Sequence, residues 1–359
     1  MQLRTHFEDM PTPNLASSDR IAQIFKGLAT PTHTFKSENG FEHDFNINIK
    51  LNQMMLTTAK RLHCLEKSSK VLDYDNVVIP AEKYDSKWTY KKFRGYQPGV
   101  AFIGKIPVYI EGRNGNSPAA YLMTETLIRC LDLLDKNKIA VKKFRSDAAA
   151  YQKEVLDLMD SRGIDFFIRA SQQTNQYTGY DNIVWKSLIM NYKEYQVASV
   201  DYAPFGEEKI YRLVFFKCIE YEINEENKYT GEKFVVRSII TNNWKMSDQE
   251  VFKFYNNRGA MELNFTNLLN DFNWKRMPFS YMNQNTAFLI LEAITSIMYN
   301  FVIEKFGKLV SFVDKSGRLK NFIFSFISVT ANWVLENDEW ILEVDSQKKY
   351  EKILDAGIS

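Results

Sequence analysis

Three acidic residues, Asp75, Asp147 and Glu262, stand where their carboxylates could share a metal ion. We expect Asp75 to end a first strand, Asp147 to follow a later strand, and Glu262 to lie on a helix. In a mixed sheet with this order of elements, the first and fourth strands are neighbours. Two carboxylates can then meet, and a helix beside the sheet can bring the third.

Crowded carboxylates repel one another, and a divalent cation removes that cost. Oxygen ligands favour Mg²⁺ or Mn²⁺ over zinc. Two such ions, about 4 Å apart, can activate a water or a 3′-hydroxyl and stabilise the leaving oxygen of a phosphodiester. Taken singly, each acid is more simply a solvated residue. Asp73 lies on the same strand face as Asp75, so the choice of the first ligand between these two stays open.

Glu262 has two partners at helical spacing, Tyr255 and Arg258, which share one helix face with it. An arginine can bind phosphate oxygens bidentately and a tyrosine can donate its hydroxyl, so this face suits a DNA backbone. The simpler alternative is a surface ion pair between Arg258 and Glu262, which are four residues apart.

The segment from Lys83 to Arg94 mixes basic and aromatic residues directly after Asp75. Basic groups neutralise phosphates, and aromatic rings stack on unpaired bases, so we expect DNA contact here. A solvated loop with its rings turned to the core is the alternative. Lys142, Lys143 and Arg145 could extend the basic track. The predicted DNA-binding residues are Lys83, Lys87, Trp88, Lys91, Lys92, Arg94, Lys275 and Arg276.

The elements that must position these residues follow an α/β order. Residues 71–75, 100–103 and 107–110 are predicted strands, and Gly104 and Lys105 form a hairpin turn. Predicted helix 119–134, strand 139–144, helix 149–161 and strand 165–169 come next. This order predicts an α/β sheet of mixed strand direction.

The flanking regions are predicted less regularly. Residues 1–30 begin loosely before a short helix, residues 31–46 form a loop or hairpin, and residues 47–65 form a helix. Residues 180–241 alternate strands with polar turns, as in an antiparallel insertion. A capping box of Ser247 and Glu250 begins a helix that continues past Glu262. Residues 284–306 and 319–335 are further predicted helices, and the tail after Asp345 is expected to be mobile.

Composition narrows the class of protein. The 359 residues, with a net charge of +2 and 45% hydrophobic residues, fit a globular protein of one or two domains. The cysteines Cys64, Cys130 and Cys218 form no CxxC pair, which argues against a disulfide framework or a zinc site and favours the cytoplasm. The first twenty residues do not resemble a signal peptide. Residues 286–306 contain charged residues, so we expect a buried helix and no membrane partner.

The segment from Tyr255 through Arg258 to Glu262 resembles the YREK signature (Tyr-x2-Arg-x3-Glu-x6-Lys) of cut-and-paste DDE transposases. Other segments resemble the thirteen-eighty family of bacterial insertion sequences in that superfamily. They are LDYDN (72–76), EKYD (82–85), YKK (90–92), GYQPGV (95–100), RNGN (113–116), FRSD (144–147) and NDFNW (270–274).

This resemblance covers residues 10–305 and implies an RNase H-like fold, with a β-rich insertion between the last core strand and the helix carrying the catalytic glutamate. It implies metal-dependent cleavage and strand transfer by Asp75, Asp147 and Glu262 with two Mg²⁺ or Mn²⁺ ions, and phosphate or transition-state roles for Tyr255 and Arg258. The implied partner is double-stranded DNA, as terminal inverted repeats and target, bound by a homodimer in the cytoplasm at the nucleoid.

We therefore expect the chain to be divided into an N-terminal region (1–66), two parts of the RNase H-like core (67–179 and 244–340), the insertion (180–243) and a tail (341–359). Leu269 stands where the signature has lysine, although Lys275 could substitute, and the chain starts close to its catalytic part. A truncated or inactive copy that binds DNA or a partner without cleavage is therefore the alternative. A stand-alone nuclease of the same fold is a third hypothesis.

Overall fold

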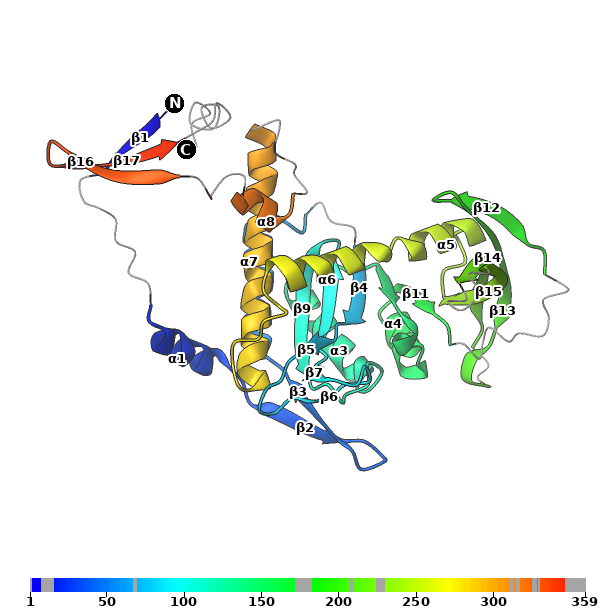
Figure 1. Cartoon of the computed structure of the whole chain (residues 1–359). Coiled ribbons are helices and arrows are strands. Elements are labelled where there is room, and N and C mark those ends of the chain that lie inside the picture. Colours follow the sequence, from blue (N-terminus) through cyan, green and yellow to red (C-terminus); the bar gives the residue numbers. More distant parts are fainter. Residues whose placement is uncertain are drawn as a thin grey trace.

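The computed structural model describes most of the chain: residues 2–7, 16–66, 70–171, 183–206, 209–223, 230–309, 313, 317–324, 328 and 330–345. Among these residues, one large sheet carries most of the core, with helices packed against it (Figure 1).

Five strands form the centre of this sheet, in the order β9-β8-β4-β10-β11. Strands β4, β8 and β9 are an antiparallel meander, whereas β10 and β11 run parallel to β4. Every residue of β8 and β9 is buried, as expected for apolar runs in the middle of a sheet. Gly104 makes the tight turn between them with a φ of 62°. The bounds are β4 Val71–Asn76, β8 Gly99–Ile103, β9 Ile106–Arg113, β10 Lys143–Ser146 and β11 Asp165–Arg169.

The sheet continues at both edges. Beyond β11 it adds β15 (Thr230–Thr241), β14 (Tyr211–Ile223), β13 (Lys193–Tyr202) and β12 (Lys186–Met190), all antiparallel. Beyond β9 it adds the hairpin of β3 (Glu42–Asn46) and β2 (Thr32–Lys36). The β-rich segment after β11 therefore extends the central sheet edge to edge, and the predicted hairpin at residues 31–46 is confirmed.

The helices cover the sheet and one another. Helices α2 and α7 pack together against β9, α3 packs on β9 and on α4, and α5 packs across β11, β13 and β14. The predicted capping box of Ser247 and Glu250 begins α5. The bounds are α1 Ser18–Leu28, α2 Ile49–Arg61, α3 Met123–Lys136, α4 Lys153–Ser161, α5 Asp248–Asn256, α6 Gly259–Asp271, α7 Met282–Leu309 and α8 Leu319–Phe322.

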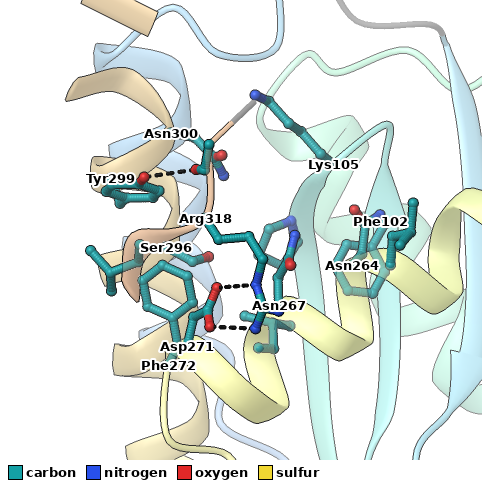
Figure 2. Close-up of a pocket in the computed structure, with 15 residues that line it drawn as sticks. Phe102, Lys105, Asn264, Asn267, Asp271, Phe272, Ser296, Tyr299, Asn300 and Arg318 are labelled. Carbon is teal, nitrogen blue, oxygen red and sulfur yellow. Dashed lines mark hydrogen bonds and ion pairs between the residues drawn. The ribbon is translucent and has the colours of Figure 1, made fainter. Parts of the chain in front are cut away.

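Two small sheets and two short 3-10 helices complete the described elements. One sheet pairs β5 (Ile79–Pro80), β7 (Arg94–Tyr96) and β6 (Lys87–Trp88), and the other pairs β1 (Gln2–Phe7), β17 (Glu339–Asp345) and β16 (Ala331–Glu336). The 3-10 helices are η1 (Ala148–Ala150) and η4 (Pro204–Gly206). Near α8, the guanidinium of Arg318 binds Asp271 of α6 at 2.6 and 3.0 Å beside a cavity of about 400 Å³ (Figure 2).

Several boundaries differ from the sequence-based prediction. The helix predicted over residues 319–335 is wrong for the described part of this range, where α8 ends at Phe322 and residues 331–335 belong to β16. Strand β16 pairs with β17 through a turn at Asn337 and Asp338, whose positive φ values suit a tight hairpin. Residues 2–7, predicted to be loose, form β1 and pair with β17, whereas residues 8–15 lie outside the described residues. The helix predicted through Glu262 is broken into α5 and α6. The tail after residue 345 lies outside the described residues.

Helix α7 is long and apolar enough to cross a membrane by length and composition, and it is the one described helix that is. Half of its apolar window is buried against the rest of the chain, including α2, β9 and β3. The core helix of a globular protein meets the same criteria, and the burial of α7 against these elements accounts for apolar residues on that side of the helix.

Candidate active site

The carboxylates of Asp75 and Asp147 stand at neighbouring strand ends. Strands β4 and β10 are parallel, and their register pairs Tyr74 with Ser146, so the next residue of each strand meets its counterpart at the same edge. Asp75 Oδ1 accepts a hydrogen bond from the backbone N–H of Asn76 at 2.8 Å, and Asp147 Oδ1 accepts one from Ala149 at 3.1 Å. Each side chain is thereby oriented by its own loop.

Asp73, the alternative first ligand, is committed to another contact. Its two carboxylate oxygens accept hydrogen bonds from Arg145 at 2.6 and 2.8 Å, and the side chains are almost fully buried. Arg145 also donates to the carbonyl oxygen of Phe254 at 2.6 Å. Its guanidinium is therefore enclosed, and the expectation that Arg145 extends a DNA-binding track is not supported by this position.

A break between α5 and α6 brings a third group to the strand ends. Arg258, at the break, binds Asp75 Oδ2 through Nη2 at 2.5 Å. Tyr255, in the last turn of α5, donates its hydroxyl to the carbonyl oxygen of Ser146 at 3.3 Å. Two of the three residues predicted to share a helix face thus contact the two strand ends, although the helix is interrupted between them.

Glu262 is placed differently. It lies in the first turn of α6 and is exposed, while its negative charge still acts on Asp75. Among the described residues, no group of three or more acidic, histidine or cysteine side chains lies close enough to hold a metal ion. The structure therefore brings together Asp75, Asp147, Arg258 and Tyr255, and leaves Glu262 at the edge of the site.

Burial dominates the electrostatics of this site. It raises the pKa of Asp75 to about 6, and the neighbouring charges of Asp147 and Glu262 act in the same direction. The guanidinium of Arg258 and the N–H of Asn76 oppose this shift in pKa without cancelling it. A bound cation would favour the ionised form of Asp75. The oxygen donors of Asp75 and Asp147 thus fit a hard divalent ion in chemistry and in electrostatics.

Arg169 is a residue of this site that the sequence analysis missed. It is the last residue of β11, the strand beside β10, and its backbone pairs with Ile239 of β15, whereas its guanidinium makes no hydrogen bond or ion pair with another described residue. Burial lowers the pKa of Arg169, and the positive charges of Arg237 and Arg258 act in the same direction, whereas Tyr255 and Asp147 oppose them. A charged residue at the end of an otherwise apolar strand segment was the available signal.

An open cavity of about 1010 Å³ extends from the two carboxylates toward exposed aromatic rings. The β2–β3 hairpin, the segment around β6 and the loop after β9 form its walls. These segments contribute Ser37, Asn39, Phe41, His43, Trp88, Thr89, Tyr90, residues 115–119 and Tyr121. Asp75, Asn76, Gln97 and Asp147 complete the lining.

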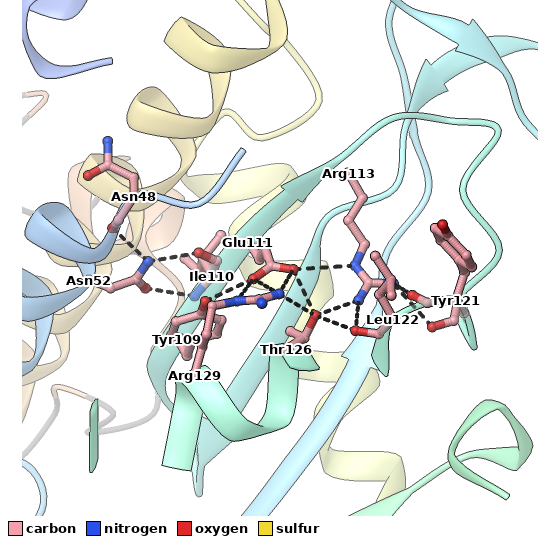
Figure 3. Close-up of polar contacts among 11 residues, drawn as sticks. Asn48, Asn52, Tyr109, Ile110, Glu111, Arg113, Tyr121, Leu122, Thr126 and Arg129 are labelled. Atoms are coloured by element: carbon pink, nitrogen blue, oxygen red, sulfur yellow. Dashed lines mark hydrogen bonds and ion pairs between the residues drawn. The ribbon is translucent and has the colours of Figure 1, made fainter. Parts of the chain in front are cut away.

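A buried ion network fixes the loop after β9 (Figure 3). Glu111 accepts two hydrogen bonds from Arg129 at 3.0 Å and one from Thr126 at 2.7 Å. Arg113, which is fully buried, donates to the carbonyl oxygens of Ala119 and Tyr121 at 3.2 and 2.9 Å. The loop that lines the cavity is therefore held by the buried charges of Glu111 and Arg113, with the partly exposed Arg129 beside them.

The predicted DNA-binding residues differ in how far they are engaged within the fold. Lys87 pairs with Asp44 at 2.8 Å, and Arg94 donates to the carbonyl oxygen of Ser86 at 2.5 and 3.0 Å, so both are engaged within the fold. Lys83 is half-buried. The others are exposed: Trp88, Lys91, Lys92, Lys275 and Arg276.

Comparison with known protein families identifies the class of this protein. The family profile described as "Transposase DDE domain group 1" matches residues 13–355, so the chain belongs to this family of DDE transposases. No curated protein matches.

Among solved structures, the chain is similar to one titled "Cryo-EM structure of piggyBac transposase synaptic complex with hairpin DNA (SNHP)". The two are 9% identical with a TM-score of 0.41, over 74% of this chain and 55% of that chain. The chain thus spans about half the length of that relative.

Proposed function

We propose that this protein is a bacterial insertion-sequence transposase of the thirteen-eighty type, which cuts DNA at the element's ends and joins them to a target. The observation that carries this proposal is the placement of Asp75 and Asp147 at neighbouring strand ends with Arg258 bound beside them. Membership of the transposase DDE domain family supports the same class of reaction.

The proposed core is RNase H-like. Support comes from a three-stranded antiparallel meander followed by two strands parallel to its first strand, in the order β9-β8-β4-β10-β11. Residues 67–179 and 244–340 would form this core, and residues 180–243 the insertion before the helix that carries Glu262. Residues 1–66 and 341–359 would flank it.

Asp75, Asp147 and Glu262 are the proposed ligands of two Mg²⁺ or Mn²⁺ ions. When bound, such ions lower the pKa of a water or 3′-hydroxyl and neutralise charge on the phosphate. Glu262 would have to approach, and Arg258 would have to leave Asp75. The break between α5 and α6 lies between Tyr255 and Glu262, and a rotation there is the movement that we propose for both changes.

The released Arg258 would then face a DNA phosphate, to which a guanidinium can donate two hydrogen bonds. Arg169 would supply a second cation at the end of β11, since its guanidinium makes no ion pair with another described residue. The hydroxyl of Tyr255 already donates to the backbone beside Asp147 at 3.3 Å and would keep that strand end in place.

The proposed partner is double-stranded DNA, as terminal inverted repeats and as target, held by a homodimer in the cytoplasm without a membrane. The exposed cations Lys91, Lys92, Lys275 and Arg276 would contact phosphates, with Trp88 beside them. Lys83, Lys87 and Arg94 would contribute charge from positions tied into the fold.

The direct test is cleavage of a labelled duplex that carries the genomic flanks of the gene, with Mg²⁺ and with EDTA. We expect Mg²⁺-dependent nicking and strand transfer by the wild type and none by Asp75→Asn, Asp147→Asn or Glu262→Gln. Asp132→Asn, at an exposed surface position, is the matched control and should cut normally. Nicking that survives Asp75→Asn would refute the assignment of the site.

A second function, DNA binding without cleavage, is favoured by the exposed position of Glu262 and by Leu269 in place of lysine. It predicts salt-sensitive binding by the wild type, no metal-dependent nicking, and unchanged affinity after Glu262→Ala.

A further inference from the structure

One face of α7 carries side chains at alternating spacings of three and four residues. At about 100° per residue, such spacing keeps all of them within roughly 100° of arc on one side of a helix. They are Phe288, Leu291, Thr295, Met298, Val302 and Lys305, which we call the α7 stripe. Paired helices interdigitate side chains at this spacing, so the stripe has the pattern of a helix–helix contact.

Helix α1 covers only the first turns of the α7 stripe. The ring of Phe25 lies 6.2 Å from that of Phe288, and Leu291 is partly buried. Further along the helix, Met298 and Val302 are 52% and 37% exposed. Figure 1 shows α7 at one side of the molecule, with α1 beside its N-terminal end. Within the described part of the chain, the C-terminal half of the stripe is therefore open to solvent.

Helix α1 extends this exposed apolar surface. Its side chains Ile21 and Ile24 are 43% and 45% exposed, and Ile21 lies one turn before Phe25 on the face that packs against α7. Single apolar residues are common on a protein surface, whereas several on two adjoining helices mark a place where another surface binds. We therefore expect this side of the molecule to have a partner.

The charges beside the α7 stripe have opposite signs at its two ends. Near the N-terminal end, Glu292 is half-buried and makes no hydrogen bond or ion pair with another described residue, and burial raises the pKa of its carboxyl group. Near the C-terminal end, Lys305 is exposed, and its ammonium lies 5.3 Å from the ring centre of Phe301 without an ion pair to a described residue. Glu304 and Lys308 neutralise each other at 3.1 Å. A partner on this face must therefore bring a cation to the first end and an anion to the second.

A second copy of α7 in antiparallel orientation meets both requirements. It brings Lys305 of each copy to the end of the stripe that carries Glu292 in the other, and it covers Met298 and Val302 in between. A twofold contact uses the same surface of both copies in this way. Parallel pairing would place like charges together, which is unfavourable. We propose that two copies of this chain associate through their α7 stripes, antiparallel and across a twofold axis.

The inference rests on the proposed function, in which a homodimer holds the DNA, and it names the surface through which the two copies meet. No residue of the α7 stripe lines the cavity beside Asp75 and Asp147. The pairing therefore leaves both carboxylate sites open to DNA. Because the contact is made by protein side chains alone, the dimer forms without DNA.

Sedimentation velocity of the full chain in EDTA, without DNA and over a series of concentrations, tests the pairing. We expect a concentration-dependent equilibrium between monomer and dimer. Met298→Glu puts an unpaired charge into the middle of the contact and should raise the dissociation constant of the dimer at least about 10-fold. The matched control is Ile189→Glu, at a 76% exposed position on β12, which should leave the dissociation constant within about twofold.

Charge exchange tests the antiparallel orientation and does not depend on the packing at Met298. Glu292→Lys and Lys305→Glu should each weaken the dimer roughly 3- to 10-fold, because each substituted position then faces a like charge. The double variant Glu292→Lys/Lys305→Glu should return the dissociation constant to within about threefold of the wild-type value. Parallel pairing predicts no such return, since each position would then face itself.

Three results would overturn the proposal: a wild type that stays monomeric at every concentration, whether in solution or bound to phosphatidylcholine vesicles, a dimer unchanged in Met298→Glu, or single charge variants whose loss the double variant does not restore. Mg²⁺-dependent nicking is measured on the same samples. If a monomeric wild type nicks DNA, the inference fails and the proposed function stands. If the wild type pairs through α7 but does not nick, the proposed function fails and the contact between copies stands.

Discussion

Two aspartates, two residues apart on β4, should respond in opposite ways to the same substitution. Asp73 is almost fully buried and binds Arg145 through both oxygens at 2.6 and 2.8 Å. Asp73→Asn leaves the buried guanidinium without a countercharge, and breaking such a pair costs about 3–5 kcal/mol. An asparagine oxygen retains one hydrogen bond, so we expect a loss of about 3 kcal/mol in the free energy of unfolding.

Asp75 is the reverse case. Its pKa is raised from 3.8 to about 6, so the folded state holds the proton more tightly than the unfolded state. Ionised Asp75 therefore destabilises the metal-free fold, and this cost develops as the pH rises through the window between these two values. Two pKa units correspond to at most about 3 kcal/mol. Because 27% of the side chain is exposed, about 1–2 kcal/mol is the realistic gain from Asp75→Asn at neutral pH.

The assay is urea unfolding in EDTA at neutral pH, with Asp132→Asn as an exposed control that should change stability by less than about 1 kcal/mol. We expect Asp73→Asn to unfold at lower urea, and Asp75→Asn to unfold at equal or higher urea while losing Mg²⁺-dependent cleavage. Equal destabilisation by both variants, or no effect of Asp73→Asn beyond the control, would refute the distinction between a structural and a catalytic carboxylate.

Three further predictions concern the frame around the site. Glu111→Ala should lower the free energy of unfolding by about 3–5 kcal/mol in urea titrations, because it removes the countercharge of the buried Arg113 guanidinium and the hydrogen bonds from the partly exposed Arg129. Burial raises the pKa of Asp248, but hydrogen bonds from Ser199 and Arg212 outweigh it and hold the pKa low. Asp248→Asn should therefore destabilise the fold at neutral pH, and the difference from wild type should vanish as the pH falls below the usual aspartate range. Gly115→Ala would put a Cβ 2.5 Å from two backbone carbonyl oxygens, so thermal unfolding should show a loss of about 1–3 kcal/mol and the cavity wall should shift. Wild-type stability of Glu111→Ala, a stability loss in Asp248→Asn that does not depend on pH, or wild-type stability of Gly115→Ala would contradict the respective prediction.

Sequence patterns located the central strands because these strands are buried on both faces. The apolar runs at β4, β8, β9 and β11 are short and bounded by turn residues, which a periodicity argument can detect. The same argument failed for residues 319–335, where β16 and β17 depend on a two-residue turn and on pairing with β1, far away in the sequence. Local periodicity carries no information about such a partner.

The sequence by itself determined which residue types follow the strands: Asp75 after the first, Asp147 after the fourth, and the spacing of Tyr255, Arg258 and Glu262. Only the tertiary structure decided that Asp73 is neutralised by Arg145 and that Arg258 binds Asp75. It also added Arg169 and the cavity beside the two carboxylates. The physical reason is that spacing fixes the face on which a side chain lies. The partner, burial and charge that a side chain meets there depend on strand register and packing between segments distant in the chain.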